Sequence, residues 1–203
     1  MTTTSRALAC GALAAAALGL SCVADAQSSA PAIGDAAPTR AGHSFIDVAV
    51  GRATYNTACG NVTGLSCSRT TTSYSVTAGN MITRNLGVEL TYLDLGRANR
   101  AGGSVSAHGL NIAAVGRMPL GDSLALEAKA GTTHGVTHVN TAAVSGVASG
   151  RARGFGLGYG VALNANIAGG LHGALGWEQH ELRFAGQGKS NVRAVTLGLG
   201  YTF

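Results

Sequence analysis

The sequence predicts an all-β fold, an eight-stranded antiparallel up-and-down β-barrel that spans a membrane. Large apolar residues alternate with small or polar ones in eight separate runs, which is the period-two pattern of strands with two unlike faces. Charged residues make up only 11% of the chain and 31 of its 203 residues are glycine, which is unusual for a soluble enzyme. Beyond the amino terminus, no stretch approaches the roughly 18 apolar residues of a spanning helix, so the chain would cross a membrane with strands.

The amino terminus has the three parts of a secretory signal peptide. Arg6 supplies the basic part, residues 7–20 form a short run of small and apolar residues, and Ala24-Asp25-Ala26 is a small-x-small cleavage site. The apolar run is too short for a membrane helix. We therefore expect residues 1–26 to be a signal peptide that is removed. Cleavage before Cys22, as in a lipoprotein, is the less favoured alternative because the residues before it match a lipobox poorly.

Residues 27–41 are small and polar and include two of the three prolines of the chain. Such a segment cannot bury enough apolar surface to fold by itself, so we expect a disordered lead-in. The alternating pattern begins after it, and the predicted barrel domain covers residues 42–203.

Two cysteines, Cys59 and Cys67, remain after removal of the signal peptide. An even pair in an exported protein favours a disulfide. A bridge across so short a loop should stabilise the fold by roughly 2–3 kcal/mol. Metal binding by two isolated cysteines is the weaker interpretation.

The first four alternating runs share one design, with aliphatic or aromatic side chains on one face and small, polar or acidic side chains on the other. A long polar connection, residues 55–70, follows the first run, and a short turn near residues 83–85 follows the second. The four runs, with the large residues that define each, are 44–54 (Ile46, Val48, Val50), 71–80 (Tyr74, Val76, Ala78), 86–96 (Leu86, Val88, Leu90, Tyr92) and 106–117 (Leu110, Ile112, Ala114).

The last four runs repeat this design. Pro119, Gly121 and Asp122 predict a tight turn before the fifth run. Longer connections are expected at residues 97–105, 136–150 and 183–191. The four runs are 123–135 (Leu124, Leu126, Ala128, Ala130), 152–166 (Phe155, Leu157, Tyr159, Val161, Leu163), 171–182 (Leu171, Leu175, Trp177) and 192–203 (Val195, Leu197, Leu199, Tyr201, Phe203).

The small face carries charges, and this decides which face is inside. A soluble barrel has an apolar interior and would not place Glu89, Glu127, Lys129 and Glu178 among its inward residues. A transmembrane barrel has the opposite arrangement, with large apolar residues towards lipid and polar residues towards the lumen. Runs of about 9–11 residues also match one tilted membrane crossing. We therefore expect the large face to meet lipid and the small face to meet the lumen.

On these residues and motifs, the segment 42–203 resembles the small eight-stranded outer-membrane barrels of Gram-negative bacteria: the OmpA transmembrane domain, OmpX and Ail, and the neisserial opacity proteins. The clearest element of the resemblance is the alternating aromatic terminus formed by Leu199, Tyr201 and Phe203. The resemblance implies that this terminus is the signal read by the barrel-assembly machinery. It also implies an outer-membrane location, contact with outer-membrane lipid and a periplasmic amino terminus.

The inward charges predict a lumen filled by ion pairs. Asp47, Glu89, Glu127 and Glu178 would face Lys129, with Arg97 and Arg117 nearer the ends of the barrel. A charge in a low-dielectric interior is very costly unless it is paired, so a plugged lumen is the favoured interpretation. A narrow, porin-like channel for ions or small solutes is the alternative.

Basic residues gather in the predicted outer loops and strand tops. Because arginine offers paired donors to phosphate, such a rim would contact lipopolysaccharide, or equally a host surface polyanion. A merely solvated rim is the alternative. The predicted contact residues are Arg69, Arg97, Arg100, Arg151, Arg153, Arg183 and Lys189.

Other kinds of chemistry have little support in the sequence. The glycines of residues 154–160 recur at every second position, as on the small face of a strand and unlike a nucleotide-binding loop. His108, His134 and His138 are scattered and suggest at most a weak surface metal site, with His108 across from His134. No serine and histidine pair is placed as a nucleophile and its base would be. We therefore expect no enzyme activity, no cofactor or metal and no nucleic-acid partner.

Overall fold

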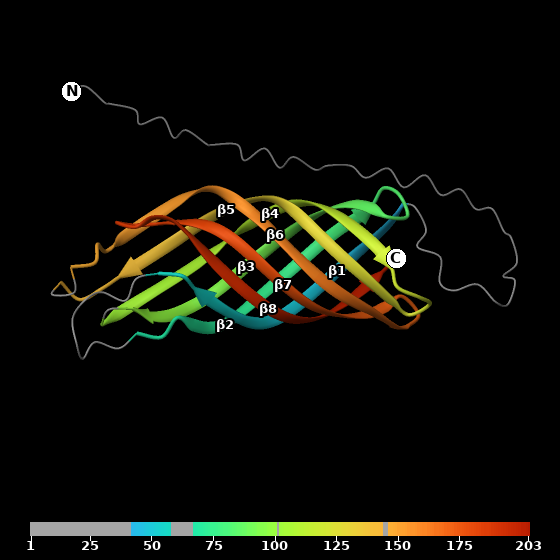
Figure 1. Ribbon diagram of the computed structural model, residues 1–203, viewed down its shortest axis with the longest axis horizontal. Coiled ribbons are helices and arrows are strands. Elements are labelled where there is room, and N and C mark those ends of the chain that lie inside the picture. Colours follow the sequence, from blue (N-terminus) through green and yellow to red (C-terminus); the bar gives the residue numbers. More distant parts are fainter. Residues whose placement is uncertain (1–41, 58–66, 101, 144–145) are drawn as a thin grey trace, which may run out of the picture. The chain divides into compact units, whose positions relative to one another are not determined.

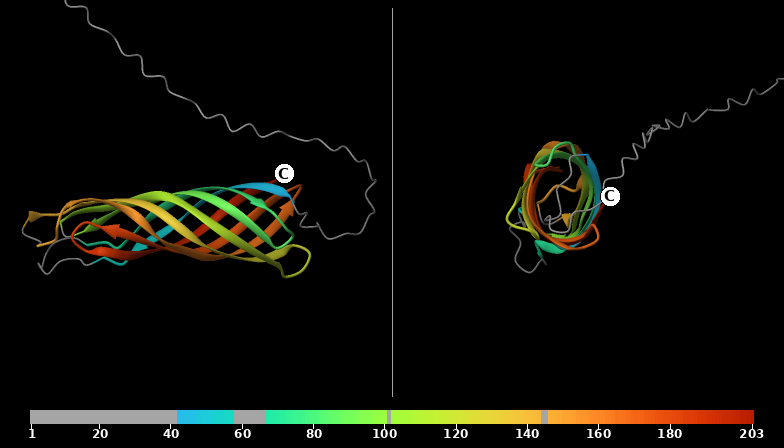
Figure 2. Two further views of the ribbon diagram at one scale, coloured as in Figure 1. Left: turned by 90° about the horizontal axis from the view of Figure 1, so that it is seen from above. Right: turned by 90° about the vertical axis from the view of Figure 1, so that its right-hand side faces the viewer.

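A computed structural model describes residues 42–57, 67–100, 102–143 and 146–203 of the protein. Its strands are β1 (His43–Tyr55), β2 (Thr70–Met81), β3 (Leu86–Arg100), β4 (Gly103–Pro119), β5 (Leu124–Asn140), β6 (Gly150–Ala168), β7 (Leu171–Phe184) and β8 (Gly188–Thr202). Each strand pairs antiparallel with the next, and β1 pairs with β8 to close a barrel (Figure 1). The end-on view in Figure 2 shows the closed ring. The predicted eight-stranded up-and-down barrel is confirmed.

The amino-terminal predictions fall outside the described residues. These are the signal peptide, residues 1–26, and the lead-in, residues 27–41, and both stay predictions. In the described part of the chain, no helix is long and apolar enough to cross a membrane.

The two ends of the barrel differ in their connections, and we name them accordingly. The turn end carries the start of β1, the end of β8 and the short connections 82–85, 120–123 and 169–170. The loop end carries the connections β1–β2, β3–β4, β5–β6 and β7–β8. At the turn end, Gly169 and Gly170 have φ of 56° and 88°, and a two-residue hairpin turn with positive φ at both positions favours glycine at each.

Strands extend further towards the loop end than the sequence predicted. β3 and β4 pair as far as Arg100 and Gly103, β7 and β8 pair as far as Phe184 and Gly188, and β5 continues to Asn140. Two predicted loops, 97–105 and 183–191, are therefore mostly strand, and the predicted loop 136–150 begins with the last five residues of β5.

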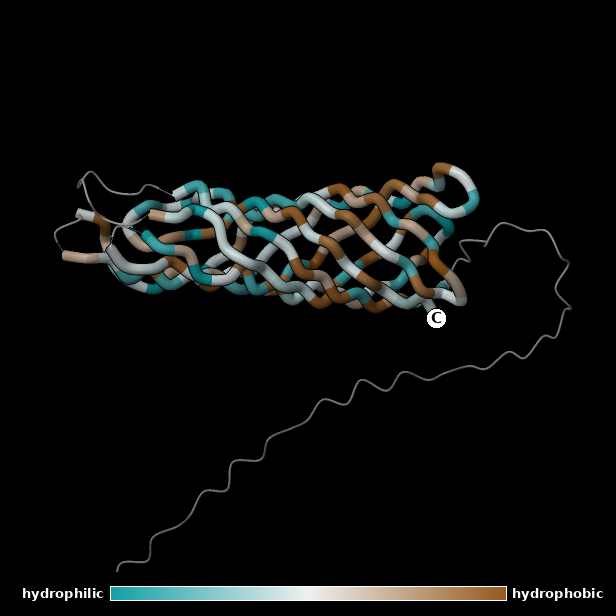
Figure 3. The backbone as a smooth tube through the Cα atoms, turned by 90° about the horizontal axis from the view of Figure 1, so that it is seen from below, coloured by the Kyte–Doolittle hydropathy of each residue, from teal (hydrophilic) through white to brown (hydrophobic). Residues whose placement is uncertain are grey.

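An apolar belt surrounds the barrel in the half next to the turn end. Leu90, Leu126 and Leu199 point outward and are 47%, 39% and 55% exposed, as are aliphatic and aromatic neighbours on every strand. The inward positions of the same strands hold mainly small and polar residues, with Phe45, Met81 and Val115 as buried apolar exceptions. Figure 3 shows more hydrophobic colour in this half, which holds the C-terminus, than in the loop-end half. The predicted lipid-facing surface is confirmed for this half of the wall.

The loop-end half, which includes segments that the sequence predicted to be loops, reverses this polarity. Its lumen is filled by buried apolar side chains, and the ring of Tyr55 packs edge-on against Phe184 with centroids 6.1 Å apart. The Tyr55 hydroxyl donates to the carbonyl oxygens of Leu95 and Gly96 at 3.1 and 2.9 Å. We call this group the apolar plug; it consists of Ala53, Tyr55, Leu93, Leu95, Ala98, Val105, Ala107, Val139, Leu182, Phe184, Val192 and Ala194.

The outer wall of the loop-end half is correspondingly polar. Arg52, Arg97, Arg153 and Arg183 are exposed on it. An apolar interior with a charged exterior is the arrangement of a water-soluble barrel. The same eight strands therefore form a membrane barrel near the turn end and a solvated barrel near the loop end.

Candidate functional site

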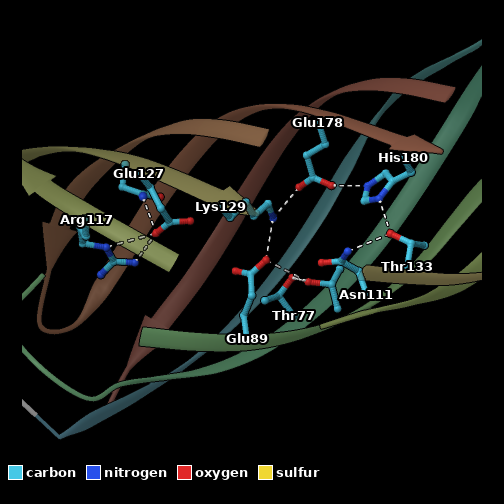
Figure 4. Close-up of polar contacts among 11 residues, drawn as sticks. Thr77, Glu89, Asn111, Arg117, Glu127, Lys129, Thr133, Glu178 and His180 are labelled. Carbon is cyan, nitrogen blue, oxygen red and sulfur yellow. Dashed lines mark hydrogen bonds and ion pairs between the residues drawn. The ribbon is translucent and has the colours of Figure 1, made fainter. Parts of the chain in front are cut away.

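Lys129 lies at the centre of the charged lumen. It projects inward from β5, and its Nζ lies 3.0 Å from Glu89 Oε1 on β3 and 2.7 Å from Glu178 Oε1 on β7 (Figure 4). All three side chains are almost entirely shielded from solvent. One ammonium group thus bridges two carboxylates on different strands, which compensates charges that would be costly in isolation.

Hydrogen bonds extend this bridge to other strands. Glu178 Oε2 lies 3.0 Å from His180 Nε2, and His180 Nδ1 lies 2.9 Å from the Thr133 hydroxyl (Figure 4). Asn111 Nδ2 donates to the same hydroxyl at 2.8 Å. On the other side, the hydroxyls of Thr77 and Thr91 are 2.9 Å apart next to Glu89. The network therefore ties β2, β3, β4, β5 and β7 together across the lumen.

Two further pairs lie closer to the turn end. Arg117 Nη2 and Nε donate to Glu127 Oε2 at 2.7 and 3.2 Å, and Asn164 Nδ2 donates to the same oxygen at 3.1 Å. His172 Nε2 lies 2.8 Å from Asp47 Oδ1. Each of the four acids predicted to face the lumen therefore has a close partner.

A small polar cavity lies among these groups. Its volume is about 50 Å³, which is enough for a few water molecules, and its lining includes Asp47, Thr77, Glu89, Glu127 and Glu178. The apolar plug occupies the lumen nearer the loop end. The ion-pair layer and the apolar plug therefore lie in series along the lumen.

A β-bulge in β3 explains why two arginines differ from their predicted positions. The pairing of β3 with β4 shifts between Asp94 and Arg97, and Gly96, at the shift, has a φ of 69°. The extra residue reverses the inward and outward positions beyond it. Arg97, expected either near the lumen or among the outer contact residues, is exposed on the outer wall, whereas Arg100, expected in an outer loop, is 2% exposed. Arg100 Nη2 donates to Gln187 Oε1 at 2.6 Å.

The other predicted basic residues are exposed at the loop end. Arg151 and Arg153 lie on β6 and Arg183 on β7, while Arg69 precedes β2. Lys189 Nζ lies 2.5 Å from Glu181 Oε1 in an exposed pair.

A row of hydrogen-bonded polar side chains, which the sequence did not predict, lies on the outer wall at the loop-end edge of the apolar belt. Gln179 Nε2 donates to the Tyr159 hydroxyl at 2.7 Å, and Arg193 Nε donates to Gln179 Oε1 at 2.8 Å. The rings of Tyr159 and Trp177 have centroids 6.0 Å apart. Amphipathic aromatic rings are typical of membrane interfaces. In the sequence, Tyr159 and Trp177 were therefore the residues that could have indicated this edge of the belt.

The remaining predicted sites are placed as follows. Cys67 is disulfide-bonded, and Cys59 lies outside the described residues, so their pairing stays a prediction. Leu199, Tyr201 and Phe203 lie on the outward face of the terminal strand, where the Phe203 amide donates to the Ser44 carbonyl oxygen at 2.9 Å.

The histidines of β4 and β5 differ in their pairing from the expectation. His108 pairs with Val136 and not with His134, and its ring stacks on that of His138, with centroids 6.2 Å apart. Within the described residues, no three histidine, cysteine or acidic side chains are close enough together to hold a metal ion.

A closed barrel with an apolar belt and a charged lumen defines a class of protein, the transmembrane β-barrels. More particularly, the model of the outer membrane protein β-barrel domain family matches residues 12–203, and the chain belongs to this family. It is therefore an outer-membrane protein that crosses the membrane with strands. No curated protein sequence matches the chain.

Solved structures of small outer-membrane barrels share the fold. Neisserial surface protein A is 13% identical, with a TM-score of 0.61 over 79% of this chain and 97% of that one. The N-terminal barrel of Pseudomonas aeruginosa OprF is 17% identical, with a TM-score of 0.54 and the same coverage. Ail, the attachment invasion locus protein of Yersinia pestis, is 16% identical, with a TM-score of 0.53 over 80% and 99%. Ail is also known in complex with the heparin analogue sucrose octasulfate.

Proposed function

We propose that this protein is a non-enzymatic surface-interaction barrel whose basic loop end contacts lipopolysaccharide phosphates or a host polyanion. The observation that carries the proposal is the set of exposed basic side chains on a solvated outer wall, opposed by few acids such as Asp94 and Glu181. The loop end would face outward from the cell, and the turn end and amino terminus would face the periplasm. The proposed contact residues are Arg69, Arg97, Arg151, Arg153, Arg183 and Lys189; Arg100 is excluded because it is buried.

The complex of Ail with a heparin analogue supports this proposal by analogy of fold. A barrel of the same architecture accommodates a sulfated ligand, and the present chain has the charge to attract one, with a formal net charge of +5. We also propose that the terminus with Leu199, Tyr201 and Phe203 is read by the barrel-assembly machinery, because these large side chains alternate on the outward face and are exposed.

Replacing Arg151 and Arg153 by glutamine should weaken binding to heparin and to lipopolysaccharide by about tenfold at physiological salt, because exposed ion pairs contribute about 0.2–1 kcal/mol each and several act together. Binding can be measured by surface plasmon resonance with the refolded protein. Arg84→Gln, at the exposed turn end, is the matched control and should leave binding unchanged. Binding of the unmodified protein that is indifferent to salt would contradict the proposal.

The two layers in series along the lumen favour a plug over the porin-like alternative. We expect the refolded protein to be silent in planar bilayers, because the ion-pair layer and the apolar plug both block ion passage. Single-channel recording is the measurement. Steady, reproducible conductance steps would favour the channel instead.

A further inference from the structure

Histidines and arginines alternate across the strands on the outer wall of β3–β6. In the row nearest the loop end, Arg97 pairs with Ser106, Ser106 with His138, and His138 with Arg151. Outward residues at paired positions are side-chain neighbours in a sheet. Arg97, His138 and Arg151 are exposed, so this row presents its polar groups to solvent.

Two further rows lie below it. In the second row, Asp94 pairs with His108, and His108 pairs with Val136, which faces Arg153. In the third row, His134 pairs with Leu110 and with Phe155, whose ring lies 4.7 Å from the His134 ring. This third row lies at the edge of the apolar belt that is nearer the loop end. We call the basic members of the three rows the histidine–arginine wall: Arg97, His108, His134, His138, Arg151 and Arg153.

The charge of this wall depends on its histidines. With neutral imidazoles, three arginines and Asp94 leave two net positive charges, and protonation of three imidazoles would add up to three more. Imidazole is the side chain that ordinarily takes up a proton between pH 8 and 5. Asp94 is the acidic group that the strand register places on the wall, and its Oδ1 accepts a hydrogen bond from the Gly96 amide at 2.8 Å.

The pH range favours a sulfate over a phosphate as the group that this wall binds. A sulfate ester keeps its negative charge between pH 8 and 5, whereas a phosphate monoester takes up a proton near pH 6. The attraction of a sulfated ligand for a basic wall is therefore not weakened in acid by the ligand itself.

We propose that the histidine–arginine wall is a binding site for a sulfated polysaccharide chain, and that its affinity rises as the pH falls from 7.5 to 5.5. The inference rests on the proposed polyanion-binding function and adds the partner and its regulation. The arginines provide binding at both pH values, and the protonated imidazoles provide the additional attraction in acid.

Binding of a fluorescent heparin octasaccharide to the protein in phospholipid nanodiscs tests this proposal, at pH 7.5 and 5.5 in 0.15 M salt. We expect the unmodified protein to bind about tenfold more tightly at pH 5.5. The triple variant His108→Gln, His134→Gln and His138→Gln should keep the affinity at pH 7.5 and gain less than about twofold in acid. His43→Gln, at the turn end, is the matched control and should keep the full gain.

Each result that departs from this expectation has a defined meaning. Equal affinity at both pH values, or a full gain in the triple variant, overturns the inference and leaves the proposed function intact. No binding of the octasaccharide at either pH overturns the inference, and the absence of binding to lipopolysaccharide-containing vesicles as well overturns the proposed function too. A gain seen with lipopolysaccharide-containing vesicles but not with the octasaccharide overturns the sulfated partner. Heat-modifiable gel mobility of each variant verifies that the barrel is folded.

Discussion

Replacing Lys129 by methionine should lower the free energy of unfolding by about 3–5 kcal/mol, because the change leaves two buried carboxylates without their shared cation. Lys129 Nζ lies 3.0 Å from Glu89 Oε1 and 2.7 Å from Glu178 Oε1, and both acids lie in a narrow lumen with room for only a few water molecules. Methionine has a similar length but neither charge nor donor. Urea unfolding of the protein in lipid vesicles measures the difference.

Two further variants separate the loss of charge balance from the loss of a side chain. Lys189→Met removes the cation of the exposed pair with Glu181 and should cost no more than about 1 kcal/mol. Adding Glu89→Gln and Glu178→Gln to Lys129→Met should restore much of the lost stability, because none of the three replaced side chains then carries a charge. An unchanged unfolding midpoint for Lys129→Met alone would show that the bridge is not what balances the lumen.

The membrane half of the barrel was predictable because one physical rule acts on each of its residues. Lipid requires large apolar groups outside, so Leu90, Leu126 and Leu199 alternate with inward neighbours that are mainly small or polar. The large apolar residues that point inward in this half are Phe45, Met81 and Val115. The period-two alternation that is visible in the sequence therefore directly reflects which side chains face lipid and which face the lumen. The partners of the lumen acids were less predictable, because pairing across the lumen depends on strand register and tilt, which alternation alone does not define.

The loop-end half was mispredicted because the same alternation has the opposite meaning there. Leu182 and Phe184 are inward and Arg183 is outward, so the strand continues past the belt with its apolar face turned to the lumen. In the sequence, polar residues next to glycine are typical of loops, so these outward strand residues were predicted to be loop residues. The bulge at Gly96 added a second difficulty, because one extra residue exchanges the two faces of β3 and sends Arg97 outward and Arg100 inward.

These two halves have a functional consequence. A barrel that stops at the membrane surface can present only loops, whereas strands that continue into water present a rigid, regularly spaced wall. The apolar plug supplies the stability that lipid supplies in the other half. The rows of arginine and histidine on β3–β6 are therefore held on strands, and a site on strands is more precisely positioned than one on loops.

Replacing Phe184 by alanine should lower the free energy of unfolding by about 3–5 kcal/mol, as expected when a buried aromatic side chain is removed from a packed core. Phe184 is 2% exposed and packs against the Tyr55 ring in the apolar plug. Arg183→Ala, one position earlier on the outer wall, should change stability by no more than about 0.5 kcal/mol because that side chain is exposed. Urea unfolding in vesicles measures both variants. If Arg183→Ala proved as costly as Phe184→Ala, the reversal of polarity between the two halves would have to be abandoned.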